Sequence, residues 1–148
     1  MTTETPHIRI GHFNDFHGKN CLLISADIHG LLELEEVFLK LSNGLELYDF
    51  STLKLLDKKF RINLIAFNGT HNSGIRKSRA DNYEWIVTKE KWGHFRERVT
   101  GLYRIGNEGN RKLNSESEDE QEIEIIFSWN EYPLKLWTKL NKENKNAL

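Results

Sequence analysis

The feature that most constrains the fold is an apolar run that leads directly into a capped amphipathic helix. Residues 21–26 (Cys-Leu-Leu-Ile-Ser-Ala) form a short apolar segment, which indicates a strand. Asp27 follows at once, and aspartate is a preferred residue at the position just before a helix. Asn43-Gly44 then supplies a C-terminal stop signal. We therefore predict a strand, Asp27 as the N-cap, and a helix that runs to about Ser42.

The predicted helix has one face that suits a core, and that face has one exception. Large apolar side chains recur at helical spacing, at Leu31, Leu34, Phe38 and Leu41. Glu35 interrupts the face, because helical geometry places it between Leu31 and Leu39. We expect its carboxylate to lie at the rim of the core, either paired or reaching solvent.

The rest of the chain alternates between strand and helix patterns. Strands are predicted over residues 7–12, 45–50, 60–67, 83–88 and 122–129, and a second helix over about 89–104. The strand at 60–67 is richer in apolar residues than the strand at 45–50, which indicates a more central place in a sheet. The polar segment 68–82 is predicted to be a loop, and about 106–121 to be a mobile loop. The tail after Leu140 is expected to fray.

This order of elements predicts an α+β fold. Hairpins with short turns favour a mainly antiparallel sheet, and both helices are expected on one face of it, which gives a two-layer sandwich. The length of 148 residues suits one domain that spans residues 1–148.

Charge balance and cysteine content narrow the functional classes. The chain has 21 basic and 22 acidic residues and a formal net charge of -1, whereas nucleic-acid-binding proteins show a basic excess. Cys21 is the only cysteine, which fits a reducing compartment, and its apolar neighbours indicate a buried structural thiol. Residues 1–6 lack a signal-peptide pattern, and no apolar stretch is long enough to span a bilayer. We expect a cytoplasmic protein with no nucleic-acid partner and no membrane partner.

The sharpest chemical motif is Asp27-Ile28-His29-Gly30, which lies where the predicted strand 21–26 ends and the first predicted helix begins. It resembles the Asp-x-His-Gly metal motif of calcineurin-like metallophosphoesterases, and His71 lies in a loose echo of that family's Gly-Asn-His motif. In such a phosphoesterase Asp27, His29 and His71 would hold divalent metals that activate water. The family's Gly-Asp-x-x-Asp and Gly-His-x-His motifs do not occur in this sequence. The favoured interpretation is that Asp27 caps the helix and His29 is exposed in its first turn.

Other candidate groups are better explained by structure than by chemistry. His7 and His12 lie an odd number of residues apart, so a regular strand points them to opposite faces, and His17 with Asp15 fits a solvated turn. Glu122 and Glu124 share a face of one strand, as in a solvated sheet face. The tryptophans are predicted to pack in the core; they are Trp85, Trp92, Trp129 and Trp137.

Two segments resemble small bacterial immunity proteins of polymorphic-toxin systems. One is the strand and helix at residues 24–41, where Gly30-Leu31 precedes mixed Leu and Glu. The other is residues 125–133, whose end is similar to a Ser-x-x-Glu-Tyr-Pro ending of some such proteins. The resemblance implies an intracellular protein that is not an enzyme. Its partner would be a cognate protein toxin, with no catalytic, metal or cofactor-binding residues.

The C-terminal third adds three expectations. Acidic residues concentrate between Glu116 and Glu124, where they would either attract a basic toxin surface or simply form a solvated loop. Pro133 has no amide hydrogen and is expected to end the preceding strand. Tyr132 is predicted to pack on the edge of the core rather than to anchor a partner.

Overall fold

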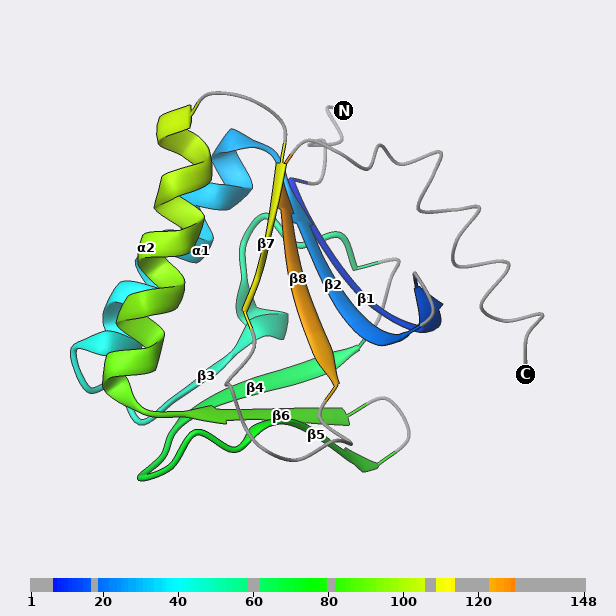
Figure 1. Cartoon of the computed structure of the whole chain (residues 1–148), viewed down its shortest axis with the longest axis vertical. Coiled ribbons are helices and arrows are strands. Elements are labelled where there is room, and N and C mark those ends of the chain that lie inside the picture. Colours follow the sequence, from blue (N-terminus) through cyan, green and yellow to red (C-terminus); the bar gives the residue numbers. More distant parts are fainter. Residues whose placement is uncertain are drawn as a thin grey trace.

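Eight strands, two α-helices and one short 3-10 helix make up the part of the chain that the computed structural model describes, which comprises residues 7–16, 19–58, 62–79, 82–105, 109–113 and 123–129. The strands form two four-stranded sheets, and the helices pack together beside them (Figure 1). The α+β class predicted from the sequence is therefore confirmed.

The first sheet has the strand order β1-β2-β8-β7. Its strands are β1 (Ile8–Phe16), β2 (Lys19–Ala26), β7 (Gly109–Lys112) and β8 (Glu124–Trp129). β1 and β2 pair antiparallel, and β7 pairs antiparallel with β8. The central pair, β2 and β8, runs parallel with Cys21 opposite Glu124, so the centre of the sheet joins distant parts of the sequence.

Both faces of β2 are buried. Leu22 and Ile24 have no exposed surface and belong to the core shared with the helices. Cys21 and Leu23 point to the opposite face by strand alternation and are equally inaccessible. The expected burial of the Cys21 thiol is confirmed. A strand that is buried on both faces needs a nearly continuous run of apolar residues, and residues 21–26 provide one.

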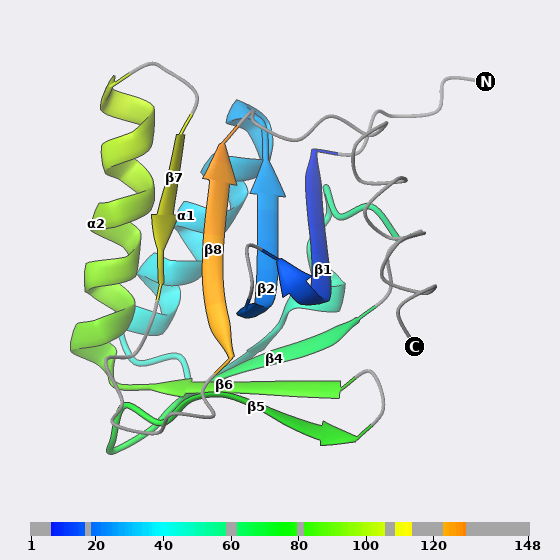
Figure 2. The ribbon, with the colours of Figure 1, turned by 45° about the vertical axis from the view of Figure 1, so that its right-hand side comes forward.

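The second sheet has the strand order β3-β4-β6-β5 and lies across one end of the first sheet and of the helices (Figure 2). Its strands are β3 (Leu47–Asp49), β4 (Asn63–Asn68), β5 (Gly74–Arg79) and β6 (Asn82–Val87). The central pair, β4 and β6, is again parallel, and the two outer pairs are antiparallel. The connection from β4 to β5 therefore passes over the end of β6, which lies between them in the sheet.

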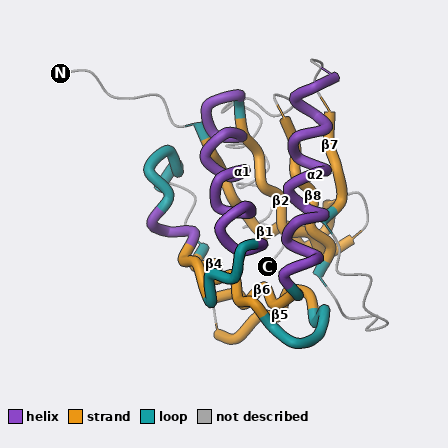
Figure 3. Tube along the Cα trace, turned by 90° about the vertical axis from the view of Figure 1, so that its left-hand side faces the viewer, coloured by secondary structure: helices purple, strands orange, loops and turns teal. Residues whose placement is uncertain are grey.

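The two helices run side by side in opposite directions over one face of the first sheet (Figure 3). They are α1 (Ile28–Ser42) and α2 (Lys89–Ile105), close to the predicted bounds. An ion pair of 3.3 Å joins Glu35 of α1 to Arg96 of α2, so of the two expected alternatives, paired or reaching solvent, Glu35 is paired. Among the described residues, no helix combines the length and the apolar character that crossing a membrane requires.

An aromatic cluster joins the helices to the second sheet. Trp85 of β6 has no exposed surface, and its ring centroid lies 4.7 Å from that of Trp92 and 5.4 Å from that of Phe95, both on α2. Phe38 of α1 and Phe50, in the short 3-10 helix η1 (Phe50–Thr52), complete the cluster. Packing in the core is thus confirmed for Trp85 and Trp92, and Trp129 is also buried. Trp137 lies outside the described residues.

The structure corrects the sequence-based fold in three respects. The strands divide into two sheets where one was expected, although four of the six pairings are antiparallel as predicted. β5 occupies most of the second half of the predicted loop 68–82, and β7 lies inside the predicted loop 106–121. Residues 106–108, 114–122 and the tail after Leu140 lie outside the described residues, and the single domain over residues 1–148 stays a prediction.

Replacement of Trp85 tests whether the aromatic cluster holds the fold together. Trp85→Ala should lower the free energy of unfolding by about 3–5 kcal/mol, because a fully buried indole leaves a cavity among rings that cannot collapse. Leu32→Ala is the control, since Leu32 is 51% exposed on α1 and should change stability by less than about 0.5 kcal/mol. Urea unfolding measures both, and equal losses for the two variants would contradict the role of the cluster.

Candidate functional site

Asp27 acts as the N-cap of α1, as the sequence predicts. Its Oδ1 accepts a hydrogen bond of 3.0 Å from the backbone amide of Gly30, and its Oδ2 contacts Nδ1 of His7. The backbone amide of Asp27 in turn donates to the carbonyl of His7 at 3.2 Å. The ring of His29, which is exposed, stands edge-on to that of His7 with centroids 4.9 Å apart. Both carboxylate oxygens of Asp27 are therefore engaged by the chain itself.

Gly30 completes the motif for a steric reason. A Cβ atom at this position would overlap the carbonyl oxygen of His7 and lie 2.6 Å from Cγ1 of Ile8. The first turn of α1 can lie this close to the start of β1 only if residue 30 has no side chain. The Asp-x-His-Gly sequence is thus explained by the entry into the helix.

His71 lies far from Asp27, at the other end of α1. The side-chain amide of Asn68, three residues earlier, donates to the carbonyls of Leu41 and Leu45 at 2.6 Å each. A helix of 15 residues is about 22 Å long, and three residues of chain reach about 10 Å at most, so His71 cannot join Asp27. Within the described residues, no group of three or more His, Cys, Asp or Glu side chains is arranged to hold a metal ion.

The loop that contains His71 serves the second sheet. The backbone amide of Gly69 donates to the carbonyl of Val87 at 2.9 Å, and Ser73 donates to that of Ile86 at 3.0 Å. Oδ1 of Asn72 accepts at 2.9 Å from the backbone amide of Thr88. The hydroxyl of Thr88 in turn accepts from the backbone amide of Lys91 at the start of α2. The segment that is similar to a Gly-Asn-His motif is therefore a loop between β4 and β5, held by hydrogen bonds to the end of β6.

The remaining sequence candidates do not converge. The ring of His12 lies 5.4 Å from that of Tyr83 in the second sheet, whereas His7 contacts Asp27, so the two histidines are separated as expected. Glu124 is half-buried on β8. His17, Glu122, Tyr132 and most of the acidic segment from Glu116 lie outside the described residues, and nothing is described of the side chain of Asp15.

Sequence reasoning missed a network that ties the segment before β4 to β1 and α1. The carboxylate of Glu33 accepts hydrogen bonds from the backbone amides of Lys54 and Leu55, at 2.8 and 3.0 Å. The carbonyl of Leu55 accepts from the start of β1, and Arg9 of β1 donates to the buried Asp57 at 3.2 Å. These charged groups fix the architecture, since each one is bound to a backbone group or an opposite charge.

The best candidate for a functional surface is the outer face of the second sheet, which points away from the helices and the first sheet (Figure 2). Along β4 and β6 the inward side chains are buried; they are Leu64, Ala66, Tyr83, Trp85 and Val87. The alternate side chains remain partly exposed, and they are Asn63, Ile65, Phe67, Asn82, Glu84 and Ile86.

Cross-strand pairing arranges the outer face in rows. Leu47, Phe67 and Ile86 stand opposite one another and form an apolar row, in which Leu47 is 50% exposed. The next row holds Asp49, Ile65, Glu84 and Arg76 and is here called the charged row. Asn63 and Asn82 follow, joined by a side-chain hydrogen bond of 2.7 Å. Directly paired residues point to the same face, so the rows are continuous across the strands.

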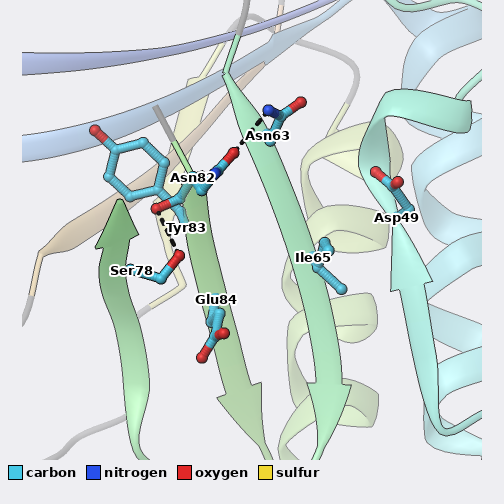
Figure 4. Close-up of a pocket in the computed structure, with 7 residues that line it drawn as sticks. All are labelled: Asp49, Asn63, Ile65, Ser78, Asn82, Tyr83 and Glu84. Atoms are coloured by element: carbon cyan, nitrogen blue, oxygen red, sulfur yellow. Dashed lines mark hydrogen bonds between the residues drawn. The ribbon is translucent and has the colours of Figure 1, made fainter. Parts of the chain in front are cut away.

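A pocket of about 350 Å³ lies over the charged row and the asparagine pair (Figure 4). It is lined by Asp49, Asn63, Ile65, Ser78, Asn82, Tyr83 and Glu84. One oxygen of Asp49 accepts from the amide of Ser51 at 2.9 Å. The carboxylate of Glu84 forms no hydrogen bond or ion pair with any residue that the structure describes. The pocket therefore presents an acceptor group that the described elements leave without a partner.

A signal for this face was present in the sequence. Ile65, Phe67 and Ile86 place apolar side chains at the alternate positions of two predicted strands, so those strands are apolar on both faces. That pattern correctly indicated a central place for β4, which lies between β3 and β6. It also follows that part of this apolar face stays exposed, most of all at Leu47.

Substitutions of Asp27 separate a helix cap from a metal ligand. Asp27→Ala should lower the free energy of unfolding by about 1 kcal/mol, whereas Asp27→Ser should lose less, because serine also caps helices. Thermal melting with and without Mn²⁺ provides the second readout, and no shift is expected in the wild type. A rise in melting temperature with Mn²⁺ that Asp27→Ser abolishes would show that Asp27 is a ligand.

Comparison with known proteins gives no relative: no protein-family model, no curated protein and no solved structure matches the chain. The resemblance to immunity proteins rests on residues 24–41 and 125–133 alone, and residues 130–133 lie outside the described part of the chain.

Proposed function

We propose that this chain is an immunity-type protein that binds and neutralises a protein toxin through the outer face of its second sheet. The observation that carries the proposal is the apolar row of Leu47, Phe67 and Ile86, which is partly exposed beside Glu84, a carboxylate with no partner in the described part of the chain. Exposed apolar side chains rimmed by polar groups are typical of surfaces that bind other proteins.

The outer face suits a protein partner better than a nucleic acid. It extends over four strands and combines aliphatic and aromatic side chains with both signs of charge, Asp49 and Glu84 against Arg76. A surface for nucleic acid needs a basic stripe that neutralises phosphates, and the formal net charge of the chain is -1. A mixed face of this kind matches the composition of protein interfaces.

The same sheet is held rigidly from behind. Ala66 and Trp85 on its inner face have no exposed surface, and Trp85 contacts the aromatic rings of both helices. A partner that binds the outer face would then order few groups of this chain, which lowers the entropic cost of association. A binding surface that is already ordered favours tight binding, which a protein that neutralises its partner by stoichiometric binding needs.

The sequence resemblance points in the same direction. Residues 24–41, which resemble immunity proteins, form the end of β2 and most of α1, as the sequence predicted. The alternative, a metal-dependent phosphoesterase built on Asp27 and His29, finds little support, because the carboxylate of Asp27 caps α1 and contacts His7. We therefore propose a binding protein located in the cytoplasm with a cognate toxin and without enzymatic activity.

Co-expression with the toxin encoded by the adjacent gene tests the proposal. The wild type should restore growth of cells that produce the toxin and should co-purify with it. Leu47→Glu should reduce affinity by about 30-fold or more, because it places a charge in the most exposed part of the apolar row.

Leu32→Glu is a matched control, since Leu32 and Leu47 are 51% and 50% exposed but lie on different surfaces. It should rescue growth like the wild type. Failure of the wild type to rescue growth or to form a complex would refute the proposed function. An equal loss of affinity in both leucine variants would instead show that the outer face is not the binding surface.

A further inference from the structure

We infer that the pocket on the outer face receives a cationic side chain of the bound toxin, an arginine being the best fit. The inference rests on the proposed function and adds the chemistry of the partner. It starts from the charged row, where Glu84 is partly buried yet forms no hydrogen bond or ion pair among the described residues. A partly desolvated carboxylate without a partner favours the approach of a cation.

The two charged groups that line the pocket, Asp49 and Glu84, are hydrogen-bond acceptors. Glu84 offers two carboxylate oxygens, and Asp49 keeps one oxygen beyond the bond that it accepts from Ser51. Asn63 donates through Nδ2 to Asn82, which leaves its own Oδ1 as a further acceptor. A lining of this kind is satisfied by a group that only donates, and guanidinium carries five N–H donors and no acceptor.

The position of Ile65 favours a long cationic side chain over a free ion. Ile65 stands between Asp49 and Glu84 in the cross-strand register, so an apolar surface separates the two carboxylates. Their strands lie about 10 Å apart, two strand spacings, which is too far for one small ion to contact both. The methylene stem of an arginine would lie over Ile65 while its head reaches Glu84.

Arg76 does not satisfy Glu84 from within the chain. The two residues pair in the register of β5 and β6, but no ion pair forms between them, and Arg76 is exposed at the sheet edge.

The apolar row next to the charged row then explains how water would be excluded from the bound cation. Apolar contacts around a charged pair raise the strength of that pair.

The test is the affinity of purified variants for the toxin encoded by the adjacent gene, measured by calorimetry at low and high salt. Glu84→Gln keeps the shape of the side chain and removes its charge, and it should weaken binding by about tenfold or more. Glu36→Gln is the control, because it makes the same change in net charge on an exposed site of α1 and should leave the affinity within about twofold.

A double-mutant cycle then identifies the cation. One arginine-to-alanine variant of the toxin should lose as much affinity as Glu84→Gln, and the combined variants should lose little more. If the wild type binds the toxin but Glu84→Gln binds equally well, the cation pocket is wrong while the proposed function stands. If the wild type does not bind, both fall together. Self-association of the wild type through this face, lost in Leu47→Glu, would also overturn the inference.

Discussion

The packing of Trp85 is the constraint on which the rest of this structure depends. Its indole contacts rings from α1, α2 and η1, so one residue of β6 joins both helices to the second sheet. Because the inner face of that sheet is committed to this cluster, only its outer face is available to a partner. The position of the candidate binding surface is thus a consequence of how the core is assembled.

Charged residues around α1 and β1 stabilise the same architecture through hydrogen bonds and an ion pair. Asp27 caps the helix, Glu33 binds the backbone of residues 54–55, and Arg9 pairs with the buried Asp57. A buried carboxylate needs such a partner, because removing it from water is costly otherwise. The contrast with Glu84 is informative, since that carboxylate lies partly buried on the outer face and has no partner among the described residues.

Local patterns predicted much of this fold, and non-local pairing accounts for the rest. The cap at Asp27, the helix to Ser42 and the position of Glu35 on the apolar face follow from spacing within a few turns of chain. β5 and β7 are edge strands, and exposed Arg76 and Lys77 give β5 the polar sequence of a loop. The division into two sheets depends on the parallel pairs β2–β8 and β4–β6, which no local pattern encodes.

The candidate site was harder to predict, because its residues come from four strands. Glu84 and Asp49 are each ordinary members of an alternating strand, and only the register places them on either side of Ile65. The Asp-x-His-Gly motif is contiguous in the sequence, whereas the residues of a binding face are not. The apolar residues of the outer face are visible in the sequence, but only the fold and the register place them beside Asp49 and Glu84.

The central claim is that the outer face of the second sheet contacts the toxin. Methyl NMR spectra of the labelled protein, recorded as the toxin is added, test it most directly. Leu47, Ile65 and Ile86 should shift or broaden, while Ile28 and Leu32 on α1 should keep their positions. Perturbation confined to Ile28 and Leu32, with the three outer-face methyl groups unchanged, would contradict the account.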